Sequence, residues 1–522
     1  DKDLERLKQR LIKDRNEAFE ISQTVNDNIG KAVLDNNMEY LSEYENILSG
    51  LTKDDVNNAV KKYFDLNKTA VILVHPAKQA NVSFQGKARQ PINMKNIEEQ
   101  TLQNNFDIGF YETKNNNFNY NVSLVSDVPY HKKAGVTEVL NAIYSMGTKS
   151  SNENDWNIFK EENNLKLNAG FCGYSIFASA QSSQDDRKLA LEKTKELLYN
   201  PNITQENLNK AKEIIRDSLE RRQDSALSLY YDNEAQTNPY AFSKDEILKS
   251  LDSITTTDVE DCKNYILNNA RGVITANLPK ADKDGCKQDI IDAGMSLDKV
   301  KPNKVQTLDL YSKNTKPQVL TKANNNSQAD IMQVYKFKCD NTLEEAVLGE
   351  ITNTILSSSS IGLFDNLREK QHLAYSVFSN IEREGNLGEV SCNILTTTDN
   401  KDIGEISYDN VKKSIEGFTN QIEELKNGKF TDKDLENAKL AMKAKLLDNE
   451  GTSVKLYALS SGMNSKYGID YKNKLYALID NMTRDDVVDF AERIFKNPPI
   501  YSIVASQDTL DANKDFFDSL TC

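Results

Sequence analysis

Histidine is scarce in this sequence. The 522 residues include three histidines, His75, His131 and His372. They lie far apart in the chain, and no two of them can share one helical turn. A zinc site built from two histidines one turn apart is therefore excluded for this chain. We expect surface or structural roles for His75, which precedes a proline at a strand end, and for His131, which lies in a loop.

Cysteine pairs and long apolar runs are also missing. None of the six cysteines forms a C-x-x-C pair, which argues against a zinc knuckle or a thioredoxin-like site. About one cysteine per 90 residues does not indicate a disulfide framework. Cys339 and Cys392 fall on predicted strands of one domain and could be neighbours, but we expect buried free thiols. No apolar run approaches the roughly 18 residues that a membrane-spanning helix needs.

Positive charge is not in excess. The net charge is −14 at pH 7 and the isoelectric point is near 5.0. Nucleic-acid binding is disfavoured, because contact with phosphates needs a basic face. An acidic surface is usually a solubility feature, although it also suits basic peptides. No secretory signal peptide is visible, and the sequence indicates no particular compartment.

A helix-start pattern occurs three times. Thr52, Thr255 and Thr483 each precede an aspartate by three residues, which is a short form of the capping box and suits the helix dipole. The valine that follows each aspartate lies 51 or 52 residues after a leucine of an earlier amphipathic helix; these pairs are Leu4 and Val56, Leu208 and Val259, and Leu435 and Val487. Such constant spacing indicates a duplicated unit of roughly 200 residues, which is far longer than a solenoid repeat.

Each complete unit combines strands and helices. In copy two the apolar positions of the first helix are Leu208, Ala211, Ile215 and Leu219, and Leu435, Ala438, Met442 and Leu446 repeat the spacing in copy three. Thr204 and Thr431 are plausible N-caps for these helices. Expected strands and helices of the front halves are 106–126, 134–147, 165–182, 329–339, 342–356 and 373–398. The fold class is therefore α+β, with repeated units of about 200 residues, each a mostly antiparallel sheet with helices packed on one face.

The repeat also predicts the domain boundaries. We expect 1–78 to be the back half of a preceding homologous domain, so that the chain is the back part of something larger. Residues 99–283 and 309–522 are expected to be complete domains. Asn-, Gln- and Lys-rich stretches that lack a helical pattern are interpreted as linkers, at 79–98 and 284–308.

One stretch combines chemically useful side chains at a helix–strand junction. Residues 357–382 place Arg368 at the end of a predicted helix and Tyr375 at the start of a strand. Arginine offers a planar fork of donors and tyrosine a phenol, and both can point into one cavity. From the residues alone, a structural salt bridge and a half-buried tyrosine remain the alternative.

This stretch resembles the C-terminal signature of the insulinase and pitrilysin zinc metallopeptidases, the inverzincins. The run Leu-Arg-Glu-Lys-Gln-His-Leu-Ala-Tyr-Ser-Val from Leu367 to Val377 matches a family motif in which arginine and tyrosine reach the substrate at the zinc site. The resemblance implies that Arg368 and Tyr375 bind substrate and act in catalysis. His372 replaces the usual small residue, and we interpret it as a tolerated surface change and not as a ligand.

A second resemblance lies one repeat earlier. Residues 135–148 are similar to the family's zinc helix, and the glycine, Leu140 and the final Met-Gly-Thr agree. The positions of the two histidine ligands hold Glu138 and Ala142, the position of the base glutamate holds Asn141, and Asp217 falls roughly where the third ligand would come. An H-x-x-E-H helix works only with its histidines one turn apart and a carboxylate beside them. We therefore expect no metal on this chain, and zinc on an N-terminal half.

The resemblance covers nearly the whole chain and implies the function. The chain is expected to be the C-terminal, zinc-free half of a zinc metalloendopeptidase, inactive alone, that forms the peptide chamber and pairs with a zinc-bearing half in the same polypeptide or in a separate chain. The alternatives are a stand-alone non-catalytic subunit of a two-chain peptidase, and a peptide-binding or assembly protein with no proteolytic role. The expected partners are peptide substrates and that other half, without nucleic acid or membrane span.

Overall fold

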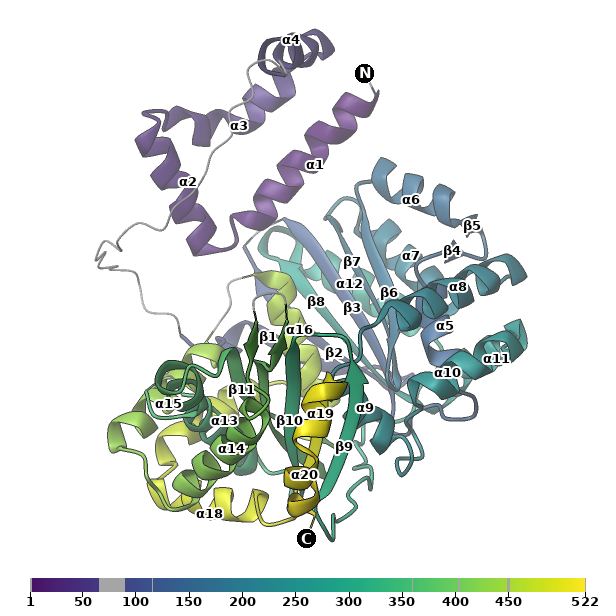
Figure 1. Cartoon of the computed structure of the whole chain (residues 1–522). Helices are drawn as coiled ribbons and strands as arrows, with labels where there is room; N and C mark the ends of the chain where they lie inside the picture. Colours follow the sequence, from purple (N-terminus) through teal and green to yellow (C-terminus); the bar gives the residue numbers. More distant parts are fainter. Residues whose placement is uncertain are drawn as a thin grey trace.

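Two β-sheets with their helices form the body of the molecule, and four helices stand apart from them (Figure 1). The structure is a computed structural model, and it describes residues 2–64, 90–114, 116–358, 360–401, 404–447 and 451–521. His75 with the strand end expected beside it, most of the expected linker 79–98 and Cys522 lie outside the described residues.

The four N-terminal helices are α1 (Lys2–Ala18), α2 (Ser22–Leu34), α3 (Glu39–Gly50) and α4 (Lys53–Tyr63). They are the purple elements at the top of Figure 1. Helix α1 is attached to the body by the Lys13 ammonium, which donates to the backbone carbonyls of Asn164 at 2.9 Å and Gln181 at 3.3 Å.

The first sheet has six strands in the order β1-β2-β8-β3-β7-β6. Its strands are β1 (Ile97–Thr101), β2 (Phe106–Thr113), β3 (Asn117–Ser126), β6 (Lys166–Cys172), β7 (Ser175–Ser183) and β8 (Ala270–Pro279). Only the pairing of β2 with β8 is parallel. One face packs on α5 (Val136–Ile143), α7 (Arg187–Tyr199), α8 (Gln205–Arg221), α11 (Thr256–Asn269) and α12 (Lys283–Met295). Shorter or peripheral elements are β4 (Gly147–Thr148), β5 (Ser151–Asn152), α6 (Glu153–Glu162) and α10 (Lys244–Ser250).

The second sheet has five strands in the order β11-β12-β10-β15-β9. They are β9 (Gln318–Asn324), β10 (Gln328–Lys338), β11 (Ala374–Glu384), β12 (Leu387–Thr397) and β15 (Ile500–Ser506), and only β15 and β9 are parallel. Its main core contains α13 (Leu343–Leu356), the π-helix η5 (Phe364–Lys370), α14 (Asn410–Lys426), α15 (Asp432–Leu446), α17 (Tyr471–Leu478), α18 (Arg484–Ile494), α19 (Gln507–Ala512) and α20 (Lys514–Leu520). Strands β13 (Asp399–Asn400) and β14 (Glu405–Ile406) pair beside it.

The two units exchange one helix each. Helix α16 (Thr452–Asn464) follows α15 in the chain, yet it packs on the first sheet through Leu456, Leu459 and Met463. Helix α9 (Ala226–Glu234) follows α8 and packs on the second sheet through Ala226 and Tyr230. Each sheet is therefore covered on its second face by a helix from the other unit.

Strand β8 explains why an exchanged helix is needed. All of its residues are buried, and side chains alternate between the two faces of a strand. Ile274 and Ala276 point into the core of the first unit, whereas Val273 joins the cluster around α16. Thr275 lies on that same side, because its hydroxyl donates to the carbonyl of Leu456 at 3.1 Å. A strand with two apolar faces needs a packing partner on each face.

The α+β fold class is confirmed, and so are the local signals on which it was based. Thr52, Thr255, Thr431 and Thr483 are N-caps of complete capping boxes, and the Thr204 hydroxyl accepts from the Asn207 amide. The helix expected at 342–356 begins one residue later, at Leu343. The expected strands at 165–182 and 373–398 are the β6–β7 and β11–β12 hairpins.

One expectation is wrong. A helix-poor linker is predicted over 284–308, but α12 occupies its first part. Cys286 and Ile290 lie one helical turn apart and are fully buried in the core of the first sheet. The apolar face of α12 is narrow, and its polar face gives the stretch the composition of a linker.

The repeated helices differ in how well they are covered. In copies two and three, Leu208 and Val259, and Leu435 and Val487, are buried. In the first copy the matching face is open: Leu7 and Leu11 of α1 are 49% and 46% exposed, and Val56 of α4 is 41% exposed. The first copy therefore presents an apolar surface that a sheet covers in the other two.

The cysteines are unpaired where the structure describes them. Cys339 and Cys392 are buried free thiols, as predicted, and so are Cys262 and Cys286, whereas the free Cys172 is exposed. Burial raises the pKa of the Cys262 and Cys286 thiols to about 12, so both stay protonated at neutral pH. No helix within the described ranges is long and apolar enough to cross a bilayer.

Candidate functional site at the junction of η5 and β11

Arg368 is held at the end of a π-helix that packs tightly on its neighbours. Leu363 and Leu367 are fully buried. A Cβ placed on Gly417 of α14 would lie 2.2 Å from Leu367 Cδ2, so only glycine lets the two helices approach this closely. Single π-turns occur frequently at functional sites.

His372 ends this helix in a left-handed conformation. Its φ is +54°, its amide donates to the Arg368 carbonyl at 3.2 Å, and the Leu373 amide donates to the Leu367 carbonyl at 2.9 Å. The bond from His372 to Arg368 is that of an αL-type helix ending, in which glycine is preferred at the left-handed position. The His372 side chain is exposed, which agrees with a tolerated change in a turn.

Tyr375 occupies a β-bulge. Ala374 pairs with Thr396 and Ser376 pairs with Leu395, so no residue of β12 is left opposite Tyr375. A bulge turns a side chain away from the regular alternation of a strand. The Tyr375 side chain is 84% exposed.

The Arg368 guanidinium contacts two aromatic rings. Its Cζ lies 4.4 Å from the ring centroid of Tyr375 and 4.4 Å from that of Phe364. Its Nε lies 3.3 Å from the Glu369 carboxylate. Stacking uses the face of the guanidinium and leaves the in-plane N–H groups available to acceptors. Within the described parts of the chain, no hydrogen bond from this guanidinium or from the Tyr375 hydroxyl is found. The structure thus brings the two predicted residues into contact.

The degenerate zinc helix is α5, and its residues do not fit a zinc ion. Ala142 has no donor atom, and the Asn141 side-chain oxygen accepts a hydrogen bond from the Phe171 amide at 2.9 Å. Glu138 accepts from the Thr137 hydroxyl at 2.7 Å, and Asp217 pairs with Arg221 at 2.9 Å. No cluster of three or more His, Cys, Asp or Glu suited to a metal occurs among the described residues.

His131 lies at a distance from the Arg368–Tyr375 pair in the fold. Its ring packs edge-on against Tyr240 with centroids 5.2 Å apart, and its Nδ1 lies 3.0 Å from the Pro129 carbonyl. These are the contacts of a structural loop residue.

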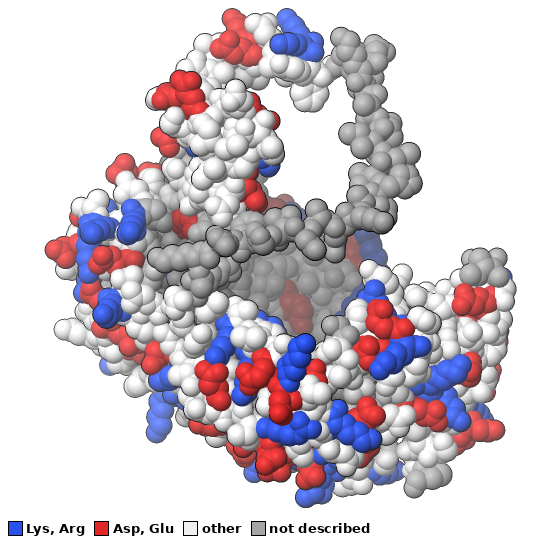
Figure 2. Space-filling model, turned by 90° about the vertical axis from the view of Figure 1, so that its left-hand side faces the viewer, with Lys and Arg blue, Asp and Glu red and all other residues white. Residues whose placement is uncertain are grey.

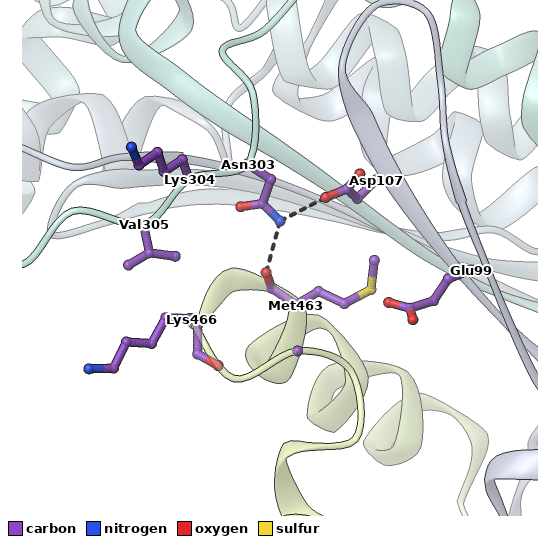
Figure 3. A pocket seen from close by; sticks show the side chains of 9 residues that line it. Glu99, Asp107, Asn303, Lys304, Val305, Met463 and Lys466 are labelled. Atoms are coloured by element: carbon purple, nitrogen blue, oxygen red, sulfur yellow. Dashed lines mark hydrogen bonds between the residues drawn. The ribbon is translucent and has the colours of Figure 1, made fainter. Parts of the chain in front are cut away.

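Several hollows lie where the two units meet, and the sequence motifs gave no sign of them. A cavity of about 370 Å³ at the end of α16 contains Asn303, whose amide donates to Asp107 at 2.9 Å and to the Met463 carbonyl at 3.0 Å (Figure 3). A groove of about 850 Å³ runs between α16 and the first sheet beside Tyr457. A pocket of about 470 Å³ lies against α5 and includes Glu138 and Asn141. These pockets form where the two units pack together, so local sequence patterns do not predict them.

Charges of both signs are mixed over the face seen in Figure 2. No continuous basic surface is visible on that face, in agreement with the net charge of −14.

Comparison with known proteins finds a family model that matches part of the chain. Residues 277–442 match the family model described as the peptidase M16 inactive domain. The resemblance to insulinase-type peptidases is confirmed. The match runs from the end of β8 through α12, the front half of the second unit and α14 into α15, and therefore includes the Arg368–Tyr375 junction. No curated protein matches the chain.

Solved structures extend the likeness to the whole fold. The peptidase M16 inactive domain from Pseudomonas fluorescens superposes with a TM-score of 0.66 at 18% identity, over 79% of this chain and 98% of that one. The periplasmic protease PqqL from Escherichia coli has a TM-score of 0.64 at 11% identity, over 88% of this chain and 52% of PqqL. The ferredoxin protease FusC, in complex with Arabidopsis ferredoxin, has a TM-score of 0.62 at 13% identity, over 88% and 51%. The chain thus spans about half the length of PqqL and FusC, and at these identities the likeness concerns the fold.

Proposed function

We propose that this chain is the zinc-free, C-terminal half of a zinc metalloendopeptidase, in which Arg368 and Tyr375 bind the substrate peptide. The observation that carries the proposal is the contact of these two side chains, 4.4 Å from guanidinium carbon to ring centroid, at a helix end and a β-bulge. The match to the peptidase M16 inactive domain over 277–442 includes both residues and supports the proposal.

The chemistry of the pair suits peptide hydrolysis. The guanidinium face is stacked on Phe364 and Tyr375, so its N–H groups are oriented in advance toward an acceptor. A substrate carbonyl can accept from Arg368 and from the Tyr375 phenol, and both bonds strengthen as negative charge develops on that oxygen. The catalytic zinc would be held by the other half, because the positions of α5 offer it no ligand set.

The uncovered N-terminal helices support the role of a completing half. The faces of α1 and α4 correspond to faces that a sheet covers in the other two copies. A sheet from the zinc-bearing half would cover them and would bring its site opposite the Arg368–Tyr375 pair. Closure of the two halves would then exclude water from the peptide.

The test is peptide hydrolysis by the complete assembly of this chain with its zinc-bearing half. Arg368→Ala and Tyr375→Phe should each lower kcat/KM by roughly 10²- to 10³-fold, which is the usual loss for one donor to a developing oxyanion. Arg368→Lys should not restore activity, because lysine lacks the planar fork. The control is Lys370→Ala, two residues away and exposed, which should leave kcat/KM unchanged. Unchanged hydrolysis in the Arg368 and Tyr375 variants would refute the proposal.

Two alternatives predict different results. A stand-alone subunit would be recovered as a separate polypeptide of about this length beside a zinc-bearing chain, and it would show the same loss of hydrolysis in the Arg368 and Tyr375 variants. A peptide-binding protein without proteolytic role would bind peptides while no assembly containing it hydrolyses them.

A further inference from the structure

The pocket against α5 lies between the two units. Its walls are the exposed side of α5, the turn between β6 and β7, the segment that follows α9, and the hairpin between β11 and β12. Its volume of about 470 Å³ is within the range of sites for small ligands or single side chains. It is distinct from the Arg368–Tyr375 pair, which lies at the other end of β11.

The lining combines aromatic rings with carboxylates. Six rings border the pocket: Tyr130, Phe171, Tyr174, Tyr231, Tyr240 and Phe242. Four glutamates border it as well: Glu138, Glu234, Glu384 and Glu389. No lysine, arginine or histidine belongs to this lining.

The negative charge of the pocket is only partly balanced. Glu234 is paired with Lys336, which lies behind the lining, and Glu389 accepts a hydrogen bond from the Tyr230 hydroxyl. Glu384 has no ion pair or hydrogen bond among the described residues. Burial raises the pKa of Glu389, and burial followed by the neighbouring Glu382 raises that of Glu384. Glu384 therefore lacks the compensation that a bound cation would supply, whereas the Tyr230 hydroxyl compensates Glu389 in part.

We propose that this pocket binds the cationic side chain of an arginine or lysine in an extended peptide. Aromatic faces and carboxylates together attract ammonium and guanidinium groups. A metal ion fits less well, because no metal-binding cluster occurs within the described ranges. The preference for a cation stands on the pocket alone, whereas its attachment to a peptide rests on the proposed function.

Strand β11 connects the pocket with the Arg368–Tyr375 pair. Glu382 points toward α9, because its carboxylate accepts from the Tyr231 hydroxyl at 3.3 Å. Alternation places Ser376, Phe378 and Asn380 on that same side, where all three are exposed. The nine steps along the strand from Tyr375 to Glu384 span about 30 Å at roughly 3.3 Å per residue. A peptide contacting both sites would thus carry its basic residue about nine positions from the residue held by Arg368.

The test is calorimetric titration of the full chain with a blocked, extended peptide containing one arginine. A peptide with citrulline in place of arginine keeps the shape and removes the charge, and it should bind at least tenfold more weakly. Glu384→Gln and Glu389→Gln should each weaken the arginine peptide about tenfold and leave the citrulline peptide unchanged. Glu206→Gln, on an exposed turn of α8, is the matched control and should change neither.

A second variant distinguishes a loss of binding from a loss of folding. Glu384→Lys, at an exposed position, should fill the pocket with its own cation and abolish the preference for arginine while the melting temperature stays constant. Equal affinity for the arginine and citrulline peptides, or wild-type affinity in the Glu384 and Glu389 variants, would overturn the cation site. Equal affinity for free arginine amide and for the peptide would overturn its assignment to a peptide. These titrations involve no hydrolysis, so their failure is distinguishable from that of the Arg368 and Tyr375 variants in the assembly.

Discussion

At the scale of single residues, the end of η5 combines two unusual backbone features within four positions. His372 has a positive φ, and Tyr375 lies in a bulge. The sequence motif predicted Arg368 and Tyr375 as a candidate pair, because they stand seven positions apart across a helix–strand boundary. It could not predict the bulge, which depends on pairing with Thr396 and Leu395 in another strand. The sequence motif also could not predict that the Arg368 guanidinium stacks on the Phe364 ring.

Replacing His372 should stabilise the protein. A non-glycine residue in the left-handed region carries a steric cost that glycine avoids, so His372→Gly should raise the free energy of unfolding by about 0.5–1 kcal/mol. Urea unfolding measures this change. Gln371→Gly is the matched control, because Gln371 has a right-handed conformation and glycine there should destabilise by a similar amount. Equal effects of the two substitutions would contradict the role of the left-handed φ.

At the scale of elements, α12 shows where sequence patterns were insufficient. Its buried positions are few, and Lys, Asp and Gln fill the rest, so a helix resembled a linker. The charged face of α12 nevertheless makes defined ion pairs. Lys283 and Lys287 hold Glu98 of the edge strand β1 at 2.7 and 2.6 Å. The two lysines thereby fasten the outermost strand of the first sheet to a helix that packs on its core.

This contact makes part of the stability depend on pH. Hydrogen bonds from Lys283 and Lys287 lower the pKa of Glu98 from 4.5 to about 2. A carboxylate with a lowered pKa stabilises the fold above its unfolded pKa, and this stabilisation is lost as the pH falls from about 4.5 to about 2. Because the ion pairs are solvent-exposed, we expect only about 0.5–1 kcal/mol.

Urea unfolding of Glu98→Gln at several pH values measures this effect. The variant should be less stable than wild type at pH 6, and the difference should vanish near pH 2. Glu99→Gln is the control on the same strand, because burial and then Asp107 raise the pKa of Glu99, so its carboxylate does not contribute stability that acid removes. A difference between Glu98→Gln and wild type that is constant with pH would contradict the assignment.

At the scale of the whole molecule, the repeat predicted two complete units and one incomplete copy, and the caps and strands agree with it. The exchange of α9 and α16 was not predictable, because the partners of these helices lie in the other unit and no local pattern reports them. The pockets arise from the same packing between units. The sequence therefore specified the elements and the Arg368–Tyr375 pair, whereas the contacts that join the units required the structure.

The exchange should make the two units unfold together. Leu456 belongs to the second unit in sequence but is fully buried on the first sheet, so Leu456→Ala should cost about 2–5 kcal/mol in the free energy of unfolding. The single tryptophan, Trp156 in α6, reports on the first unit, and far-ultraviolet circular dichroism reports on the whole chain. Both transitions should shift to lower urea by the same amount.

The control is Leu440→Ala on α15, where the side chain is 61% exposed and little stability should be lost. A tryptophan transition that stays at its wild-type midpoint in Leu456→Ala would show that the units unfold independently.

The exchanged helices also determine where this molecule can bend. Separating the two units would expose Val273 under α16 and Val334 under α9 at once, so the apolar contacts of both units would be lost in one motion. The contacts of both exchanged helices therefore oppose separation of the two units. A peptide that enters and leaves a closed chamber would then require the two units to move together, without separating from each other.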